Sequence, residues 1–200
     1  LVRTASGAVL LAIVAGASLS IYSYALLLFA IMVIGLVEFY KMARHNGYKP
    51  QFITGIATGI ILFIGLALPA IGVQNKSFEG IEILMAMTII FISLVIPICM
   101  VIELFKVSQT PMSNIATTIL GIVYVTLPLT LMMYIPLFLG GNTWQPWYFL
   151  FYLFIVWAND VFAYLVGITM GKHRLCERIS PKKSWEGFFG GIVAAIGAGV

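Results

Sequence analysis

The segment from residue 179 to residue 191 carries the densest group of residues that could do chemistry. It reads I-S-P-K-K-S-W-E-G-F-F-G-G, with two lysines and a glutamate between a Ser-Pro pair and several glycines. Ser180 is a good helix N-cap, and Pro181 suits the first helical position because it has no amide hydrogen to leave unpaired. The pattern therefore predicts a helix beginning at Ser180, with Lys182 and Lys183 in its first turn.

Two lysines in the first turn of a helix have the wrong sign, because the positive end of the helix dipole favours anions. Free amides, the dipole and two ammonium groups would together bind a phosphate group, so a phosphate site is one interpretation. A second interpretation begins the helix at Ser184. It places Glu186 in the favourable first turn and leaves the lysines in the preceding loop.

Asp160 is the second candidate, in the stretch W-A-N-D-V-F-A-Y-L-V-G that begins at residue 157. If this stretch is helical, its polar face comprises Trp157, Asp160, Tyr164, Gly167 and Gly171. Asp160 and Asn159 form either a structural pair bonded to a neighbouring helix or a metal or proton site at an aqueous cleft. One carboxylate does not define a metal site, so both interpretations stay open.

The elements that position these residues follow from composition. Hydrophobic residues make up 62% of the 200 residues and charged residues 9%, and the mean hydropathy is +1.07. Such a chain does not fit one apolar core inside a water-facing shell. Apolar stretches of about 20 residues, enough to cross roughly 30 Å of hydrocarbon, recur along it. We predict a single all-α domain over residues 1–200, a polytopic integral membrane helical bundle.

We predict about seven membrane-spanning helices, at residues 5–22, 24–40, 52–72, 83–103, 114–135 and 147–170 and from about 184 onward. The charged segment leaves the helix of Asp160 and enters the last helix, so both candidates are expected to meet at one membrane surface. An acidic residue at a helix centre costs about 2.5 to 3.5 kcal/mol. Glu38 and Glu103, near helix ends, are expected to reach the interface instead.

The basic residues predict the orientation, because short cytoplasmic loops retain Lys and Arg. With a cytoplasmic N-terminus, all of the eleven Lys and Arg residues except Lys76 fall on the cytoplasmic side. A further interpretation is therefore that the lysines of the charged segment only fix the orientation of the protein in the membrane. The same distribution excludes nucleic acid as a partner despite the net charge of +4, because the cations mark helix ends and not one face of a domain.

Small residues at four-residue spacing predict close helix packing. The clearest stripe is Gly187, Gly191, Ala195 and Gly199, and a shorter one is Gly55 and Gly59. A homodimer through a glycine stripe stays open, since packing within one chain uses the same signal.

Three motifs in order, W-A-N-D-V-F-A-Y-L-V-G (157–167), G-K-H-R-L (171–175) and I-S-P-K-K-S-W-E-G-F-F-G-G (179–191), resemble the phosphatidate cytidylyltransferase (CDP-diacylglycerol synthase) family of integral membrane enzymes. The resemblance covers roughly residues 155–193. It implies cytidylyl transfer from CTP to phosphatidate, giving CDP-diacylglycerol and pyrophosphate with Mg²⁺ and with a second metal ion left open. It also implies a multi-pass protein of the bacterial inner (cytoplasmic) membrane, with the active site facing the cytoplasm.

The resemblance assigns roles to the candidate residues. Lys182 and Lys183 are expected to act in catalysis by neutralising phosphate charge. Asp160 is expected to act in catalysis by holding Mg²⁺. Contacts to CTP or to the lipid headgroup are expected for Asn159, Lys172, Arg174, Ser180 and Ser184. Trp185 is expected to anchor the helix at the interface or to pack on a ligand. Glu186 is expected to pair with a lysine and fix the loop.

Members of that family continue into a C-terminal signature with K-D, H-G-G and D-R-x-D elements, which these 200 residues do not contain. The sequence is therefore expected to be truncated at its C-terminus and inactive alone. Alternatives are a related CTP-dependent membrane lipid enzyme, such as a polyprenol kinase or a CDP-archaeol synthase, and a transporter with Asp160 as coupling-ion or proton site. A transporter usually shows paired broken helices in two related halves, which this sequence lacks.

Overall fold

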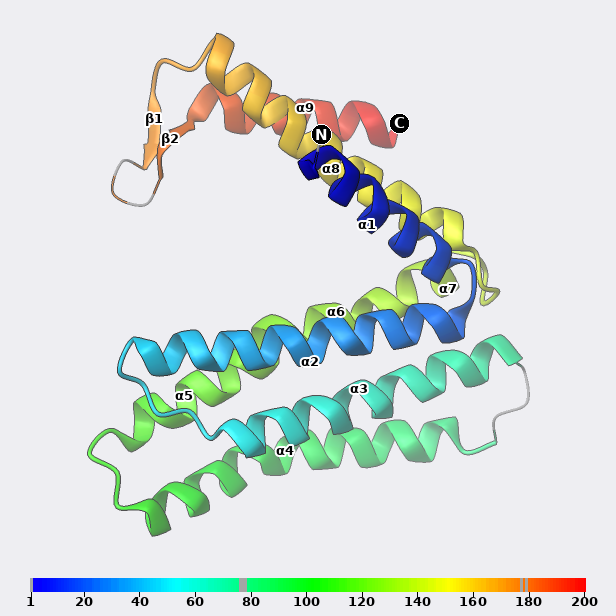
Figure 1. Cartoon of the computed structure of the whole chain (residues 1–200). Helices are drawn as coiled ribbons and strands as arrows, with labels where there is room; N and C mark the ends of the chain where they lie inside the picture. The colour runs from blue at the N-terminus through cyan, green and yellow to red at the C-terminus, as the bar shows by residue number, and fades with distance from the viewer. Residues whose placement is uncertain (1, 76–78, 177, 179) are drawn as a thin grey trace. The chain divides into compact units, whose positions relative to one another are not determined.

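A computed structural model describes residues 2–75, 79–176, 178 and 180–200 (Figure 1). Lys76, predicted on the outer side, and Ile179, at the start of the charged segment, lie outside the described residues. The chain divides into two compact units, Leu1–Pro146 and Trp147–Val200. The single domain predicted over residues 1–200 stays a prediction.

The first unit is built from long helices: α1 (Val2–Ser18), α2 (Ile21–His45), α3 (Phe52–Asn75) and α4 (Ile81–Lys106). A fifth helical stretch changes type along its length: α5 (Pro111–Gly121), the π-helical η1 (Ile122–Thr126), α6 (Leu127–Leu131), the 3₁₀-helical η2 (Met132–Tyr134) and α7 (Ile135–Leu139). Pro128 and Pro136 lie where the type changes, because proline has no amide hydrogen to continue the α-helical ladder.

The second unit contains α8 (Pro146–Thr169), a two-stranded antiparallel hairpin of β1 (Arg174–Cys176) and β2 (Ser180–Ser184), and α9 (Trp185–Gly199). The prediction of a helix beginning at Ser180 is wrong, because the lysine-bearing segment pairs with β1 as a strand. The alternative start is confirmed: Ser184 is extended and its hydroxyl oxygen accepts the amide hydrogen of Gly187, capping α9.

Five helical segments are long and apolar enough to cross a membrane within the described part of the chain: α2, α3, α4, Pro111–Leu139 and α8. α1 and α9 account for the other two of the seven predicted segments and are shorter. The helical, polytopic architecture is confirmed, apart from the short hairpin, and the chain is an integral membrane protein. The cytoplasmic N-terminus stays a prediction.

The core of the first unit is a stripe on α2 at four-residue spacing, which is at most 3% exposed: Tyr24, Leu28, Met32, Leu36 and Tyr40. A Cβ added to Gly59 would lie 2.6 Å from Leu36 Cδ1, and Gly55 lies directly against the Tyr40 ring. The predicted Gly55 and Gly59 stripe is therefore confirmed as a packing feature.

The two acids near helix ends differ. Glu38 is exposed and pairs with Lys41 at 3.0 Å, as expected for the interface. Glu103, near the end of α4, is only 4% exposed, so it is covered by protein, and its position at the membrane interface stays a prediction. Side-chain amides of Gln51 and Asn114 satisfy its carboxylate inside the first unit.

Candidate active site

The glycine stripe of α9 lies against α8 at very short range. A Cβ added to Gly187 would lie 2.6 Å from the carbonyl oxygen of Ala163, and one added to Gly191 would lie 2.7 Å from Asn159 Oδ1. Gly191 follows Gly187 on α9, whereas its partner Asn159 precedes Ala163 on α8. The two helices therefore run antiparallel. The predicted close packing of this stripe is confirmed within the chain.

The hairpin is fixed to this helix pair at Ser184. Its side chain is 4% exposed and caps α9 through the amide of Gly187, at 3.2 Å. A Cβ added to Gly171 would lie 2.7 Å from Ser184 Oγ, so the chain can pass here only with glycine. Because α8 ends at Thr169, Gly171 does not continue the helical face predicted for it.

Glu186 binds the segment that leads into β1. Its carboxylate accepts the amide hydrogens of Lys172, at 3.1 Å, and of His173, at 3.2 Å, and lies 2.7 Å from His173 Nδ1. The amide of Trp185 donates to the carbonyl of His173 at 3.0 Å. Glu186 thus fixes the loop as expected, but its side-chain partner is His173 and not a lysine.

The same contacts keep Glu186 ionised. The His173 side chain, followed by the amide of Glu186 itself, lowers the pKa of the carboxyl from 4.5 to about 2. Glu186 lies in the first turn of α9, outside the five candidate membrane spans. A charge there is also favourable beside the positive end of the helix dipole.

Sequence reasoning missed His173. It stands thirteen residues before Glu186, and nothing in its local pattern identifies that partner. The only signal is its place in the polar G-K-H-R loop that follows α8.

The lysines lie in an irregular part of β2. Arg174 pairs with Ser184 and Cys176 with Ser180, so residues 181–183 face a single residue of β1. Such a bulge bends the strand and redirects its side chains. Lys182 and Lys183 are both exposed.

Free positive charge concentrates on this hairpin. Its exposed cations among the described residues are Lys172, Arg174, Arg178, Lys182 and Lys183. None forms an ion pair with a described residue, while Glu186 is already bonded to His173. The arrangement can bind a polyanion such as a phosphate chain. Ser180, half-buried at the start of β2, and the capping Ser184 lie on the same strand.

Asp160 and Asn159 face different surroundings. Asn159 lies at the helix crossing beside Gly191, whereas Asp160 is exposed on α8 and bonds to no residue that the structure describes. Trp157 and Tyr164 are exposed as well. Trp157, Asp160 and Tyr164 thus lie on an exposed face of α8, where Asp160 bonds to no neighbouring helix among the described residues. The metal or proton site at Asp160 stays a prediction.

The described residues do not supply a complete metal cage, since they contain no cluster of three or more His, Cys, Asp or Glu side chains. Mg²⁺ in phosphate-processing sites is commonly held by one or two carboxylates, with substrate phosphates and water completing its shell. Asp160 fits the role of such a carboxylate because it is exposed and unbonded. Glu186 does not, because both of its oxygens accept hydrogen bonds.

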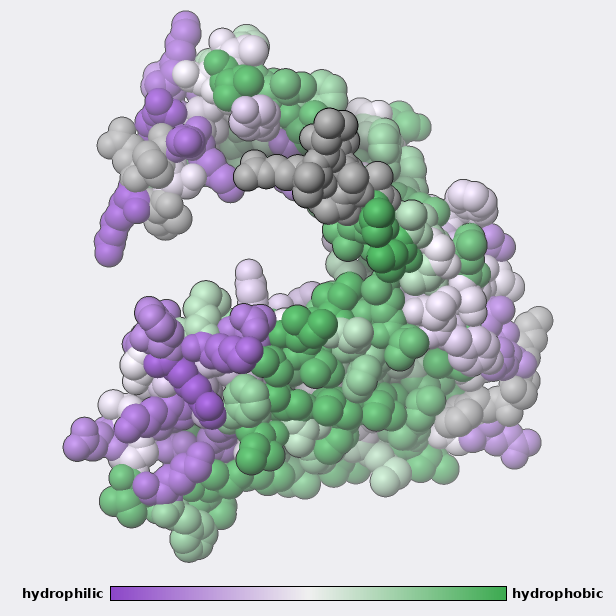
Figure 2. Space-filling model, viewed as in Figure 1, coloured by the Kyte–Doolittle hydropathy of each residue, from purple (hydrophilic) through white to green (hydrophobic). Residues whose placement is uncertain are grey.

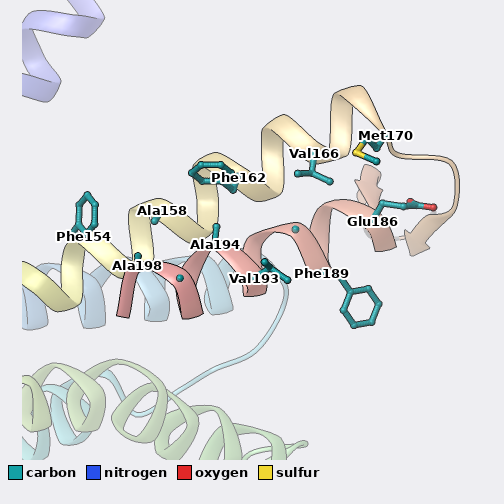
Figure 3. Close-up of a pocket in the computed structure, with 12 residues that line it drawn as sticks. Phe154, Ala158, Phe162, Val166, Met170, Glu186, Phe189, Val193, Ala194 and Ala198 are labelled. Carbon is teal, nitrogen blue, oxygen red and sulfur yellow. The ribbon is translucent and has the colours of Figure 1, made fainter. Parts of the chain in front are cut away.

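An apolar groove of about 680 Å³ runs along the crossing of α8 and α9 (Figure 3). Its α8 side repeats at every fourth residue: Phe154, Ala158, Phe162, Val166 and Met170. Glu186 lies at the hairpin end of the groove and Ala198 at the other end. The α8 row is about 24 Å long at 1.5 Å per residue. It offers an extended apolar surface that ends at the charged hairpin.

Trp185 belongs to an aromatic cluster at the start of α9. Its ring centroid lies 6.0 Å from those of both Phe188 and Phe189. Aromatic groups of this kind are enriched at membrane–water interfaces, which fits the expected anchoring role. A contact between Trp185 and a ligand stays a prediction.

Fold and site together define a polytopic membrane protein with a cationic hairpin at a tight helix crossing. The chain belongs to the Cytidylyltransferase family, whose profile matches residues 1–200.

Curated relatives with the name phosphatidate cytidylyltransferase are similar to parts of the chain. The protein from Rickettsia bellii is 36% identical over 42% of this chain and 34% of its own length. That from Staphylococcus epidermidis is 55% identical over 24% of this chain and 19% of its own length. That from Staphylococcus haemolyticus is 28% identical over 86% of this chain and 60% of its own length. The matches thus cover less than two thirds of each of these relatives.

Proposed function

We propose that the protein transfers the cytidylyl group of CTP to phosphatidate. A phosphate oxygen of the lipid attacks the α-phosphorus of CTP, the bond from that phosphorus to the bridging oxygen breaks, and pyrophosphate leaves. The product is CDP-diacylglycerol. The observation that carries the proposal is the hairpin, with two exposed lysines free of ion pairs among the described residues, in a chain of this family.

The proposal rests on charge. Both substrates are anions, and catalysis at phosphorus is largely a matter of positioning and charge neutralisation. Lys182 and Lys183 neutralise the phosphates of CTP or of the lipid. Lys172 and Arg174, at the opposite side of the hairpin, assist them. Ser180, half-buried at the start of β2, donates a hydrogen bond to a phosphate oxygen. Ser184 is 4% exposed, so it supports the site as the cap of α9 and not as the phosphate donor that was expected.

Asp160 is the proposed ligand of Mg²⁺, directly or through water, and a second metal ion remains open. When bound, the ion would neutralise phosphate charge and polarise the reacting phosphorus. Asn159 would support this region from the helix crossing. Glu186 and His173 do not touch substrate in this proposal, but hold the lysine-bearing strand at the start of α9.

The lipid acceptor is favoured over a soluble one by the apolar groove. Phosphatidate would place an acyl chain beside α8 and extend its phosphate past Glu186, at the end of the groove, to the cations of the hairpin. We further propose that the protein resides in a bacterial cytoplasmic membrane with this end facing the cytoplasm, which supplies CTP.

Substrate assays test this function. The natural full-length protein, purified in detergent, is incubated with labelled CTP and phosphatidate, with Mg²⁺ or with EDTA. We expect labelled CDP-diacylglycerol and one pyrophosphate per product, only with Mg²⁺. Polyprenol and an archaeal ether-lipid phosphate serve as competing acceptors. Preferential use of either acceptor, or ion flux in sealed liposomes lacking CTP, would contradict the assignment.

A further inference from the structure

The end of the first unit that carries the α2–α3 and α4–α5 loops has a polar pocket of about 930 Å³. Three cations line it, Arg44, Lys49 and Lys106, together with the carboxylate of Glu103. Arg44 and Lys49 come from the end of α2 and the loop after it, and Lys106 comes from the end of α4. The proposed reaction uses none of them.

The one acid of this pocket is largely compensated already. Glu103 Oε1 accepts a hydrogen bond from Gln51 Nε2 at 3.1 Å, and Oε2 accepts one from Asn114 Nδ2 at 3.3 Å. Lys106 Nζ lies 4.0 Å from Oε1, while its own side chain is half exposed. Arg44 and Lys49 have no ion pair with a described residue, so the pocket keeps an excess of positive charge.

The start of α5 also reaches the pocket. Thr110 precedes this helix of eleven residues and makes no side-chain capping bond, and both Thr110 and Asn114 line the pocket. The amide of Thr110 already donates to Ser108 Oγ, that of Asn114 donates to the carbonyl of Thr110, and Pro111 has no amide hydrogen, so this helix start contributes the positive end of its dipole. The pocket therefore combines three cations with the positive end of a helix dipole.

Part of the rim of the pocket is apolar. Val107, just after α4, lines the pocket and is 90% exposed, and Tyr48 of the α2–α3 loop lines it and is 48% exposed. Figure 2 shows hydrophilic side chains gathered at this end of the first unit, next to the hydrophobic surface of its helices. A free phosphate needs only the cations. A phospholipid needs the cations and adjoining apolar surface, and both are present.

We propose that this pocket binds the phosphate headgroup of an anionic phospholipid, with the acyl chains along the apolar rim. Basic pockets between membrane helices bind lipid headgroups by the same chemistry. This site belongs to the first unit and is independent of the proposed reaction.

Lipid binding by the full chain tests the proposal. The delipidated protein in detergent is titrated with phosphatidylglycerol or phosphatidylcholine, and bound lipid is counted by native mass spectrometry. We expect a clear preference for phosphatidylglycerol. Lys49→Gln should weaken this binding about fivefold, and the double variant Arg44→Gln/Lys49→Gln roughly thirtyfold, at about 1 kcal/mol per cation.

Lys41→Gln is the matched control, because Lys41 is an exposed α2 lysine already paired with Glu38 and does not line the pocket. It should change the affinity less than about twofold, since a surface ion pair contributes little. Lys49→Arg should retain binding. Thermal unfolding checks that each variant is folded.

Equal loss in Lys41→Gln, or undiminished binding in the folded double variant, would overturn the proposal. A third arm adds millimolar inorganic phosphate to the phosphatidylglycerol titration. We expect little competition. Full displacement by phosphate, without preference between the two lipids, would overturn the assignment to a lipid.

Discussion

At the scale of single residues, the sequence identified most charged groups of the site but not their partners. Lys182, Lys183 and Glu186 were singled out because charge is rare in this chain. His173 was not, because its contact with Glu186 depends on how the hairpin folds back onto α9. The burial of Glu103 was not predictable for the same reason, since Gln51, which donates a hydrogen bond to its carboxylate, lies fifty-two residues away.

The His173–Glu186 contact predicts an unusual titration. Because the pKa of Glu186 is lowered from 4.5 to about 2, its stabilising bonds should be complete above pH 4.5 and disappear as the pH falls toward 2. The carboxyl ¹³C chemical shift of Glu186 in detergent micelles reports this midpoint. His173→Ala should move the midpoint upward. A midpoint near 4.5 in the unsubstituted protein would contradict the described geometry.

At the scale of elements, the long helices were predictable and the hairpin was not. Apolar runs determine the helices, and a stripe such as Gly187 and Gly191 indicates their packing. A three-residue strand paired with a five-residue strand has no such periodic signal. Both Ser180 and Ser184 suit a helix N-cap. The two lysines after Ser180 are unfavourable at the positive end of a helix dipole, which favours Ser184 as the cap of α9.

The helix crossing can be tested with two glycines of α9. Gly187→Ala would place Cβ 2.6 Å from a carbonyl oxygen and 3.0 Å from Gly167 Cα, both backbone atoms that cannot move cheaply. We expect it to lower the free energy of unfolding by about 1 to 3 kcal/mol. Gly197→Ala is the control, since nothing lies within 4 Å of its added Cβ. Equal thermal stability of the two variants in detergent would contradict the tight crossing.

At the scale of the whole molecule, composition predicted a polytopic membrane protein, and five candidate spans bear this out. Three of the cations that the positive-inside rule assigns to one side, Arg44, Lys49 and Lys106, line one pocket at one end of the first unit. The full metal site could not be predicted, because one exposed carboxylate on α8 does not define its other ligands.

Cysteine labelling tests the orientation of the hairpin. Cys176 is exposed on β1, whereas Cys99 is completely buried. If the hairpin faces the cytoplasm, a membrane-impermeant maleimide should label inverted vesicles but not intact cells. Cys176→Ser should abolish this labelling and Cys99→Ser should leave it unchanged. Labelling of Cys176 in intact cells would reverse the predicted topology.

The most direct test of the proposed function measures kcat/KM for CTP in the full-length protein with Lys182→Ala and Lys183→Ala. Charge-assisted hydrogen bonds contribute about 1.5 to 3 kcal/mol, so each substitution should lower kcat/KM roughly 10- to 100-fold. Lys41→Ala, at an exposed ion pair outside the hairpin, should have no such effect. Folded Lys182→Ala and Lys183→Ala variants that turn over CTP as fast as the unsubstituted protein would contradict the assignment of the hairpin as the phosphate-binding element.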